Sequence, residues 1–449
     1  MEGAAERLAA AVRLRTIANV DPTAFDAASF ENLHAHLRRS FPLVHARLLR
    51  ETVSDFSLLY TWQGTAPAAD PVLLMGHLDV VPIEPGTEQQ WQEPPFSGRI
   101  SDGYIWGRGA IDNKSAVVGI LEAVEMLLRE GFRPKNTVYL AFGHDEEVGG
   151  THGARRIAEL LARRGVKLRM VLDEGGVIGD GLLPGIAAPV AMVGIAEKGF
   201  ATVELRSRTP GGHSSLPPSQ SAVGILSAAI ARLEDEQMLA RLESPTRQLL
   251  ERVTPEFGFG KRFVFSNLWF TEPMVLRQLQ RAPTTNAMVR TTTAATLFHA
   301  GTKDNVLPTQ ASAAINFRIL PGDSIASVLE HVRSVVNDRR IEVRQAGRFV
   351  AEPSQISSTR SEPFRALERT IQGTMPGTIV APFQVVVVTD ARHFAPLSDN
   401  IFRFLPLRLG PEDTSRMHGA NERIGVREYE TAIRFYRNLL RSVDLREQN

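Results

Sequence analysis

The stretch PVLLMGHLDVVP, residues 71–82, decides the fold and raises the question of what the protein does. Its first five residues form a short apolar run, which is typical of a strand buried inside a parallel sheet. His77 and Asp79 stand where this strand is expected to end. Imidazole and carboxylate groups are rarely buried without a partner, so we expect a cation beside them.

The pattern around this stretch repeats along the first 200 residues. Short apolar runs at 136–143 and 169–176 alternate with helical segments at 115–131 and 153–165. Strands separated by helices of this length predict an α/β fold with a largely parallel sheet covered by helices on both faces. Side chains just after the carboxyl ends of such strands meet in one crevice, where open α/β sheets bind ligands. The side chains expected to meet there are His77, Glu146 and Asp173.

A different pattern begins at residue 199. A strand, a helix, two strands, a helix and a strand follow one another over residues 199–348, with a long polar helical stretch before the second strand. This order predicts an inserted α+β module. A helix, a strand and a closing helix follow, so we assign residues 349–449 to the same domain as residues 1–198.

The composition excludes several classes of function. A formal net charge of +1 over 449 residues argues against a nucleic-acid or polybasic membrane surface. The absence of cysteine excludes disulfides and thiolate metal sites, and it leaves metal binding to His, Asp and Glu. No apolar run approaches the roughly 20 residues that span a bilayer. Because the N-terminus also lacks the apolar core of a secretory signal, we expect a cytoplasmic protein.

Five clusters carry the candidate chemistry: GHLDVVP (76–82), WGRGAIDNKS (106–115), FGHDEEVGG (142–150), VLDEGG (171–176) and SRMHGANERI (415–424). Each alone has an ordinary explanation, because a single histidine at a strand end is usually solvated or part of the core. Gly-Arg-Gly before a helix could cradle a phosphate, but the longer phosphate-binding patterns are missing. Together the clusters match the needs of two divalent cations of the zinc type, about 3.5–4 Å apart, that share one carboxylate.

Asp112 suits the shared carboxylate, and two further ligands for each ion bring the set to His77, Asp112, Glu147, Asp173 and His418. Two carboxylates are then left over. Asp79, two residues from His77, can hold that imidazole through its second nitrogen. Glu146 stands beside a ligand but is itself free, so it can take a proton from metal-bound water and pass it to a leaving amine.

In the segments 73–82, 94–114 and 140–154, the chain resembles the dinuclear zinc peptidase and aminoacylase family, which includes carboxypeptidase S, glutamate carboxypeptidase and aminoacylase. The resemblance covers nearly the whole chain and is closest to the carboxypeptidase S branch, which contains the N-fatty-acyl-amino-acid synthase/hydrolases. It implies two zinc ions, with manganese or cobalt as alternatives. One ion would take His77, Asp112 and Asp173, and the other Asp112, Glu147 and His418. It also implies a cis peptide bond between Asp112 and Asn113, where many relatives have a second aspartate.

The same resemblance makes the inserted module a ferredoxin-like lid, through which relatives pair as homodimers. In PGGHSS (210–215), His213 takes the place of the histidine that steadies the oxyanion, often from the neighbouring subunit. KDNVLPT (303–309) and NFRILPG (316–322) point to Asn305 and Arg318 as substrate-binding residues, and TDARHF (389–394) makes Arg392 a rival anchor for a carboxylate. For either arginine, a surface or structural ion pair is the alternative.

The predicted activity is hydrolysis of the amide bond between an acyl or aminoacyl group and a C-terminal amino acid. The substrate would be a small molecule with a free carboxylate, either an N-acyl amino acid or a short peptide, and the reverse condensation stays open. The apolar stretch at 265–280 has two interpretations, contact with a long acyl chain or ordinary helix packing. A non-catalytic binding protein of the same fold is the alternative outside the enzymes; loss of Glu146 or of a ligand would favour it, and all are present.

Overall fold

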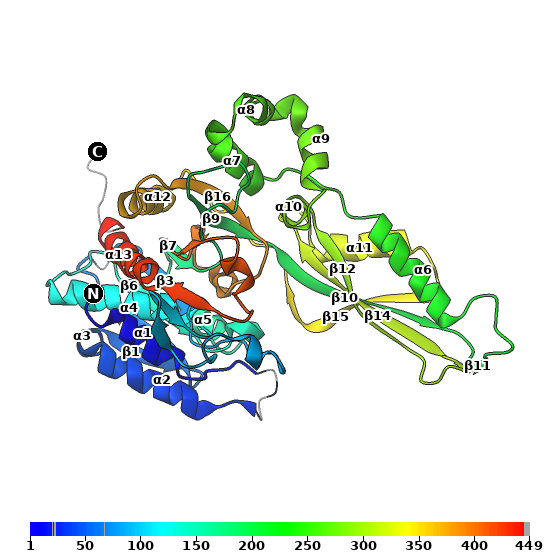
Figure 1. The fold of residues 1–449 in the computed structure, drawn as a ribbon, viewed down its shortest axis with the longest axis horizontal. Coiled ribbons are helices and arrows are strands. Elements are labelled where there is room, and N and C mark those ends of the chain that lie inside the picture. Colours follow the sequence, from blue (N-terminus) through cyan, green and yellow to red (C-terminus); the bar gives the residue numbers. More distant parts are fainter. Residues whose placement is uncertain (20, 22–23, 67, 444–449) are drawn as a thin grey trace.

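The computed structural model describes residues 1–19, 21, 24–66 and 68–443. These residues form a large α/β domain with a smaller α+β lid beside it (Figure 1). The predicted fold class is therefore confirmed. No helix in the described part of the chain is both long and apolar enough to cross a membrane.

The large domain is built on a ten-stranded sheet whose central strands β6, β3, β7 and β17 are parallel. Antiparallel neighbours extend the sheet at both ends. In spatial order the strands are β1 (Leu49–Val53), β2 (Ser57–Trp62), β6 (Val138–Gly143), β3 (Val72–His77), β7 (Met170–Asp173), β17 (Ile401–Arg403), β9 (Val190–Glu197), β8 (Ile178–Gly179) and β18 (Arg408–Leu409), with β16 (Ile379–Val385) paired to β9.

Strand β3 shows why the apolar run at its start decides the fold. Val72 and Leu74 pack into the core on one face, whereas Leu73 and Met75 pack into the core on the other, because successive side chains of a strand point to opposite sides. Full burial of each such side chain contributes about 1.5–3 kcal/mol. The strand is therefore stable only with helices on both faces.

Those helices divide between the two faces as their buried side chains require. One face carries α1 (Ala4–Val12), α2 (Ala27–Ser40), α3 (Pro42–Arg47), α4 (Lys114–Arg129), α12 (Glu362–Thr374) and α13 (Val426–Ser442). The other face carries α5 (Ala154–Arg163) and the short helix η5 (Asp390–Phe394).

A small three-stranded sheet brings two distant loops together. It pairs β4 (Arg99–Ser101) and β19 (Arg423–Gly425) with β5 (Tyr104–Trp106). The loop after β5 and the loop before β19 therefore lie side by side, although about 300 residues separate them in the chain. Both loops carry predicted site residues.

The lid is a four-stranded antiparallel sheet in the order β12-β14-β10-β15. Its elements follow one another as β10 (Gly199–Arg208), α6 (Ala222–Asp235), β12 (Thr292–Ala300), β14 (Gln310–Ile319), α11 (Ile325–Val336) and β15 (Ile341–Ala351). This chain order and this strand order define a ferredoxin-like fold. The last lid strand runs past the predicted boundary at residue 348.

A helical segment interrupts the lid between α6 and β12. It contains α7 (Ser244–Val253), α8 (Phe259–Ser266), α9 (Leu268–Leu279) and α10 (Pro283–Val289). Leu249 and Val253 of α7 pack on Val190 and Met192 of β9, so this part of the predicted lid lies on the large domain. Helices α8 and α9 project away from both sheets (Figure 1).

Candidate active site

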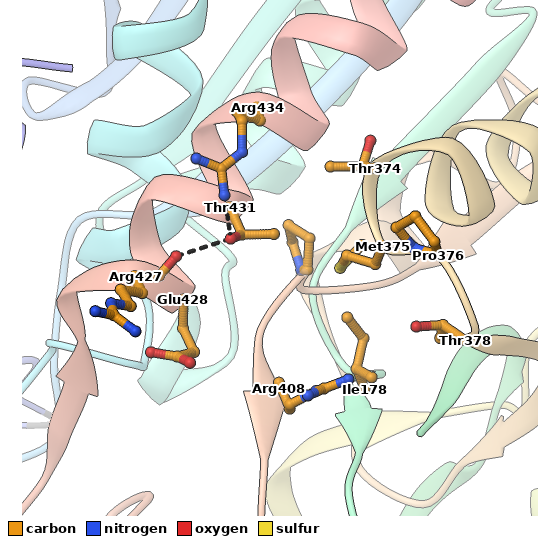
Figure 2. Close-up of a pocket in the computed structure, with 11 residues that line it drawn as sticks. Ile178, Thr374, Met375, Pro376, Thr378, Arg408, Arg427, Glu428, Thr431 and Arg434 are labelled. Atoms are coloured by element: carbon orange, nitrogen blue, oxygen red, sulfur yellow. Dashed lines mark hydrogen bonds between the residues drawn. The ribbon is translucent and has the colours of Figure 1, made fainter. Parts of the chain in front are cut away.

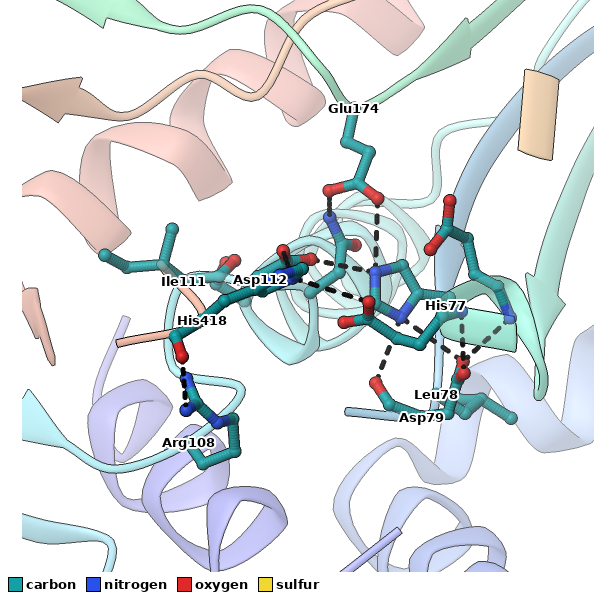
Figure 3. Close-up of polar contacts among 12 residues, drawn as sticks. His77, Leu78, Asp79, Arg108, Ile111, Asp112, Glu174 and His418 are labelled. Atoms are coloured by element: carbon teal, nitrogen blue, oxygen red, sulfur yellow. Dashed lines mark hydrogen bonds and ion pairs between the residues drawn. The ribbon is translucent and has the colours of Figure 1, made fainter. Parts of the chain in front are cut away.

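The predicted convergence at the carboxyl ends of the parallel strands occurs. His77 ends β3, the short helix η3 (Glu146–Val148) follows β6, and Glu174 follows β7. Asp112 comes from the loop before α4 and His418 from the loop before β19. Figure 3 shows Asp112 and Glu174 directed at the His77 ring.

The two nitrogens of His77 have separate partners. Nε2 lies 2.9 Å from Oδ1 of Asp112 and 3.1 Å from Oε1 of Glu174. Nδ1 lies 3.0 Å from the carbonyl oxygen and 3.3 Å from the carboxylate of Asp79. Burial lowers the pKa of His77, but the charge of Glu174 and the hydrogen bonds with the carboxylates hold that pKa well above its ordinary value. Nε2 is thus the nitrogen that faces the site, and Asp79 stands behind the ring.

Asp79 also orders the turn that carries the two glutamates. Its side chain is fully buried and accepts hydrogen bonds from the backbone N–H groups of Glu146 at 3.3 Å and Glu147 at 3.1 Å. A single carboxylate therefore contacts both the imidazole and the acidic turn.

Asp112 lies between the two imidazoles, with one carboxylate oxygen toward each. Its Oδ2 is 3.1 Å from Nε2 of His418, which is also 3.4 Å from Glu147. The hydrogen bonds with these two carboxylates raise the pKa of His418 to about 10. This is the arrangement expected of a carboxylate shared between two cations.

Asp173, which was predicted as a ligand, does not lie beside His77; Glu174 occupies that position. Oδ2 of Asp173 accepts the backbone N–H of Ala391 at 2.8 Å, on the η5 side of the sheet. Glu174 places one oxygen at His77 and accepts a hydrogen bond from Asn113 through the other, at 2.5 Å. Asp173 is the last residue of β7, and the side chain that follows it faces the opposite way. Burial, reinforced by the charge of Asp112, raises the pKa of Glu174 to about 8.

A buried ion pair that the sequence analysis missed holds the two distant loops together. Nη1 of Arg108 lies 2.6 Å from Glu422, and Nη2 donates to the carbonyl oxygen of His418 at 3.0 Å. The second oxygen of Glu422 accepts the backbone N–H groups of Ile111 and Asp112. Arg108 and Glu422 belong to the clusters at 106–115 and 415–424, and their opposite charges were the signal from which this pair could have been predicted. The peptide bond between Asp112 and Asn113 is cis, as the resemblance implied.

The site opens into a cleft of about 640 Å³ between the large domain and the lid. Glu146, Arg318 and Arg392 all line it. Burial raises the pKa of the Glu146 carboxyl well above its ordinary value. A carboxyl group in this position can exchange a proton with a group bound in the cleft.

The two candidate arginines differ in what they already bind. Arg392 donates to the carbonyl oxygens of Thr389 at 2.6 Å and Gly149 at 2.7 Å. The guanidinium group of Arg318 lies over the ring of Phe200, 4.7 Å from its centre, and makes no hydrogen bond or ion pair with any residue that the structure describes. Only Arg318 therefore keeps its full set of donors for a ligand.

The structure does not bring His213 and Asn305 to this site within one chain. Both are exposed at the far tip of the lid, where the short strands β11 (Gly212–His213) and β13 (Val306–Leu307) pair (Figure 1). Nδ1 of His213 lies 2.7 Å from the hydroxyl of Ser215, and the carbonyl oxygen of Asn305 accepts the N–H of Ser214. The lid sheet separates this tip from the cleft. The apolar stretch at 265–280 is also absent from the cleft lining.

The side chains present fit two divalent cations. Among the described residues, three groups have ligand atoms within 4.8 Å of one another: His77, Asp112 and Glu174; Asp112, Glu147 and His418; and His77, Glu146 and Glu147. Oε1 of Glu147 is buried and has no hydrogen-bond partner, as expected of an atom that contacts a cation. The donors are imidazole nitrogens and carboxylate oxygens, which zinc, manganese and cobalt accept.

A second hollow, of about 240 Å³, lies beside α13 and the end of α12 (Figure 2). Three arginines and three threonines contribute to its lining. It contains none of the predicted site residues and no part of the acidic cluster, so we place the chemistry in the cleft.

Comparison with known proteins agrees with this geometry. The sequence model of peptidase family M20/M25/M40 matches residues 73–442. A probable carboxypeptidase S-like protein of Dictyostelium discoideum is 41% identical over 98% of this chain and 85% of its own. The N-fatty-acyl-amino acid synthase/hydrolase of Homo sapiens is 40% identical over 91% of this chain and 82% of its own.

Solved structures share the fold. The M20 family metallo-carboxypeptidase Sso-CP2 of Sulfolobus solfataricus superposes with a TM-score of 0.73 at 18% identity, covering 99% of this chain and 100% of that one. A dinuclear metal-binding peptidase of the M20 family from Bacillus subtilis reaches 0.60 at 15% identity, covering 98% of each chain. The chain therefore belongs to peptidase family M20/M25/M40 and is a hydrolase of that family.

Proposed function

We propose that the protein hydrolyses the amide bond between an apolar acyl group and an amino acid with a free carboxylate. The observation that carries this proposal is the position of Asp112 between His77 and His418, with Glu146 and an unpaired arginine in the same cleft. A non-catalytic binding protein would not need this combination.

For the ligands we propose His77, Asp112 and Glu174 at one cation and Asp112, Glu147 and His418 at the other, with Glu174 replacing Asp173. Zinc is the proposed metal, and manganese and cobalt are the alternatives. Bound there, the cations would supply Lewis-acid polarisation of the scissile carbonyl and lower the pKa of the attacking water. Asp79 keeps His77 in the tautomer whose Nε2 faces the site.

Glu146 is the proposed general base. It lies beside the ligand Glu147, and its carboxyl lines the cleft. It would take a proton from the attacking water and deliver it to the departing nitrogen, so that one carboxylate serves both proton transfers. Since its ordinary acidity is weakened by burial, it holds a proton readily between the two steps.

Arg318 is the proposed anchor for the substrate carboxylate. A guanidinium group binds a carboxylate with two parallel hydrogen bonds, for which it needs free donors. Arg392 instead joins η5 to Gly149, directly after the η3 turn with the two glutamates, so we propose that it positions that turn.

For the substrate we favour an N-acyl amino acid over a peptide. Part of the cleft wall is apolar, with contributions from Val148, Val177, Phe200, Phe349, Leu405 and Met417. An acyl chain can cover such a wall, whereas a peptide backbone would leave its polar groups unpaired there. The relatives named above include an N-fatty-acyl-amino acid synthase/hydrolase, which supports the same substrate class. Cleavage of short peptides is the alternative.

We also propose that His213 and Asn305 act across a homodimer. Their exposed position at the lid tip leaves them free to enter the cleft of a neighbouring chain, and there His213 could donate a hydrogen bond to the developing oxyanion. A cytoplasmic location stays a prediction.

The test is turnover of a matched panel by the protein loaded with zinc, manganese or cobalt. The panel pairs N-acyl amino acids of increasing chain length with dipeptides that share the same C-terminal residue, and release of the free amino acid is measured. We expect metal-dependent release that is greatest for apolar acyl groups. Glu146→Ala should abolish release while the metal content persists. If no member of the panel released its amino acid with any of the three metals, the enzyme proposal would be refuted.

A further inference from the structure

Helices α8 and α9 carry a cluster of exposed apolar side chains, here called the aromatic patch: Phe259, Phe263, Trp269, Phe270 and Met274. Phe259 is 86% exposed and Trp269 is 83% exposed. Helices of this kind normally turn such side chains toward a core. The patch lies outside the cleft, so the proposed hydrolysis does not account for it.

The four aromatic rings of the patch form one continuous series. The ring centres of Phe259 and Phe263 are 6.5 Å apart, those of Phe263 and Phe270 6.3 Å, and those of Trp269 and Phe270 4.7 Å. Single exposed apolar residues are common, but contiguous ones usually mark a surface that binds something.

Helix α9 does not need the patch for its own stability. Leu268 and Val275, on the other side of α9, are buried in a small core with Leu242 and Val289. On α8, Val264 and Phe265 are partly buried against the same core. The aromatic face of the two helices is therefore additional to these contacts. It is carried on a part of the molecule that projects beyond both sheets (Figure 1).

The charges around the patch are mainly positive. Lys261, Arg262 and Arg277 on the same two helices are exposed. The acidic residue of α9, Glu272, is paired with Arg247 at 2.7 Å. An aromatic surface edged by lysine and arginine complements a surface with an apolar interior and anionic head groups.

We propose that the aromatic patch docks on an anionic lipid surface, with Phe259, Phe263 and Trp269 entering the head-group region. A projecting tip can enter a deformable lipid surface, whereas a protein partner would need a matching groove. A second copy of the chain has another surface available, the exposed edge strand β12 with Leu297 and Phe298. The proposal does not depend on the substrate assigned above.

Tryptophan fluorescence reports this docking directly. Of the four tryptophans, Trp62, Trp91 and Trp106 are buried, so Trp269 alone is exposed. We expect its emission to shift to the blue when the full chain meets vesicles of phosphatidylcholine with about 30% phosphatidylserine. Sedimentation with the vesicles should accompany the shift. In the variant Trp269→Phe, sedimentation should persist while the shift disappears.

Two variants and a control separate the contributions. Phe259→Ser with Trp269→Ser should weaken sedimentation about tenfold or more, because two apolar side chains are lost. Lys261→Glu with Arg262→Glu should weaken binding to the anionic vesicles more than to pure phosphatidylcholine. The control is Leu49→Ser, which removes a leucine that is 62% exposed on the large domain and should leave binding unchanged.

Three results would overturn the proposal. One is absence of both sedimentation and blue shift in the wild-type protein. Another is undiminished vesicle binding by both the serine variant and the charge variant, when their circular dichroism spectra match that of the wild type. The third is self-association that the patch variants abolish, with no vesicle binding, since that would make a second copy the occupant. Because the charge variant alters only exposed side chains, it tests the proposal even if the serine variant fails to fold.

Discussion

Replacing Arg318 by methionine tests how the substrate carboxylate is held. Methionine keeps much of the side-chain length over Phe200 but removes every donor. A hydrogen bond to a charged group contributes about 1.5–3 kcal/mol, so the loss of a two-bond clamp should cost at least about 3 kcal/mol. At 1.36 kcal/mol per tenfold, kcat/KM should fall by a factor of about 150 or more.

The loss should fall mainly on KM, because the clamp acts in the ground state as well as in the transition state. Steady-state kinetics on an N-acyl amino acid would measure it. The same kinetics would also be measured on that substrate with its carboxylate converted to an amide. Wild type and Arg318→Met should then differ little, since the group that the arginine binds has been removed.

Arg392→Met is the matched control. Its guanidinium already donates to two carbonyl oxygens, so its removal should loosen the turn that carries Glu146 and lower kcat rather than raise KM. A larger rise in KM for Arg392→Met than for Arg318→Met would contradict the role of Arg318 as the carboxylate anchor. So would an equally strong loss of kcat/KM by Arg318→Met on the amidated substrate and on the free acid.

Three further outcomes are expected. Glu174→Gln should lower the bound metal from two equivalents toward one by elemental analysis, while Asp173→Asn, whose contact is with η5, should keep both; the opposite result would restore Asp173 as a ligand. Glu422→Gln leaves the buried Arg108 charge uncompensated and should lower the free energy of urea unfolding by about 3–5 kcal/mol, and a change below about 1 kcal/mol would contradict the role of the pair. Burial lowers the pKa of His34 to about 4, below its unfolded value of about 6.5. The unfolded state therefore takes up the proton first as pH falls. The contribution of neutral His34 to the free energy of unfolding is complete above pH 6.5 and is lost toward pH 4. At pH 5 the loss is about 2 kcal/mol. Urea unfolding of His34→Gln should show a shallower loss of stability between pH 7 and pH 5 than the wild type, and an identical slope would be evidence against this assignment.

The sequence alone determined the sheet and where its chemistry would gather. The alternation in β3 requires packing on both faces, and parallel strands end at one edge, so His77 and the turn carrying Glu146 had to meet. Asp79 could be placed behind His77 because only two residues separate them. Each of these positions depends only on local spacing and on one property of parallel sheets.

Only the tertiary structure decided the choices that depend on distant contacts. Asp173 and Glu174 are adjacent and both acidic, and the backbone N–H of Ala391 determines which of them turns away from the site. Arg318 and Arg392 look alike in the sequence, but carbonyl oxygens elsewhere in the chain occupy the second. A motif specifies which groups are present, whereas the side to which each group points is set by hydrogen bonds between segments that come together only on folding.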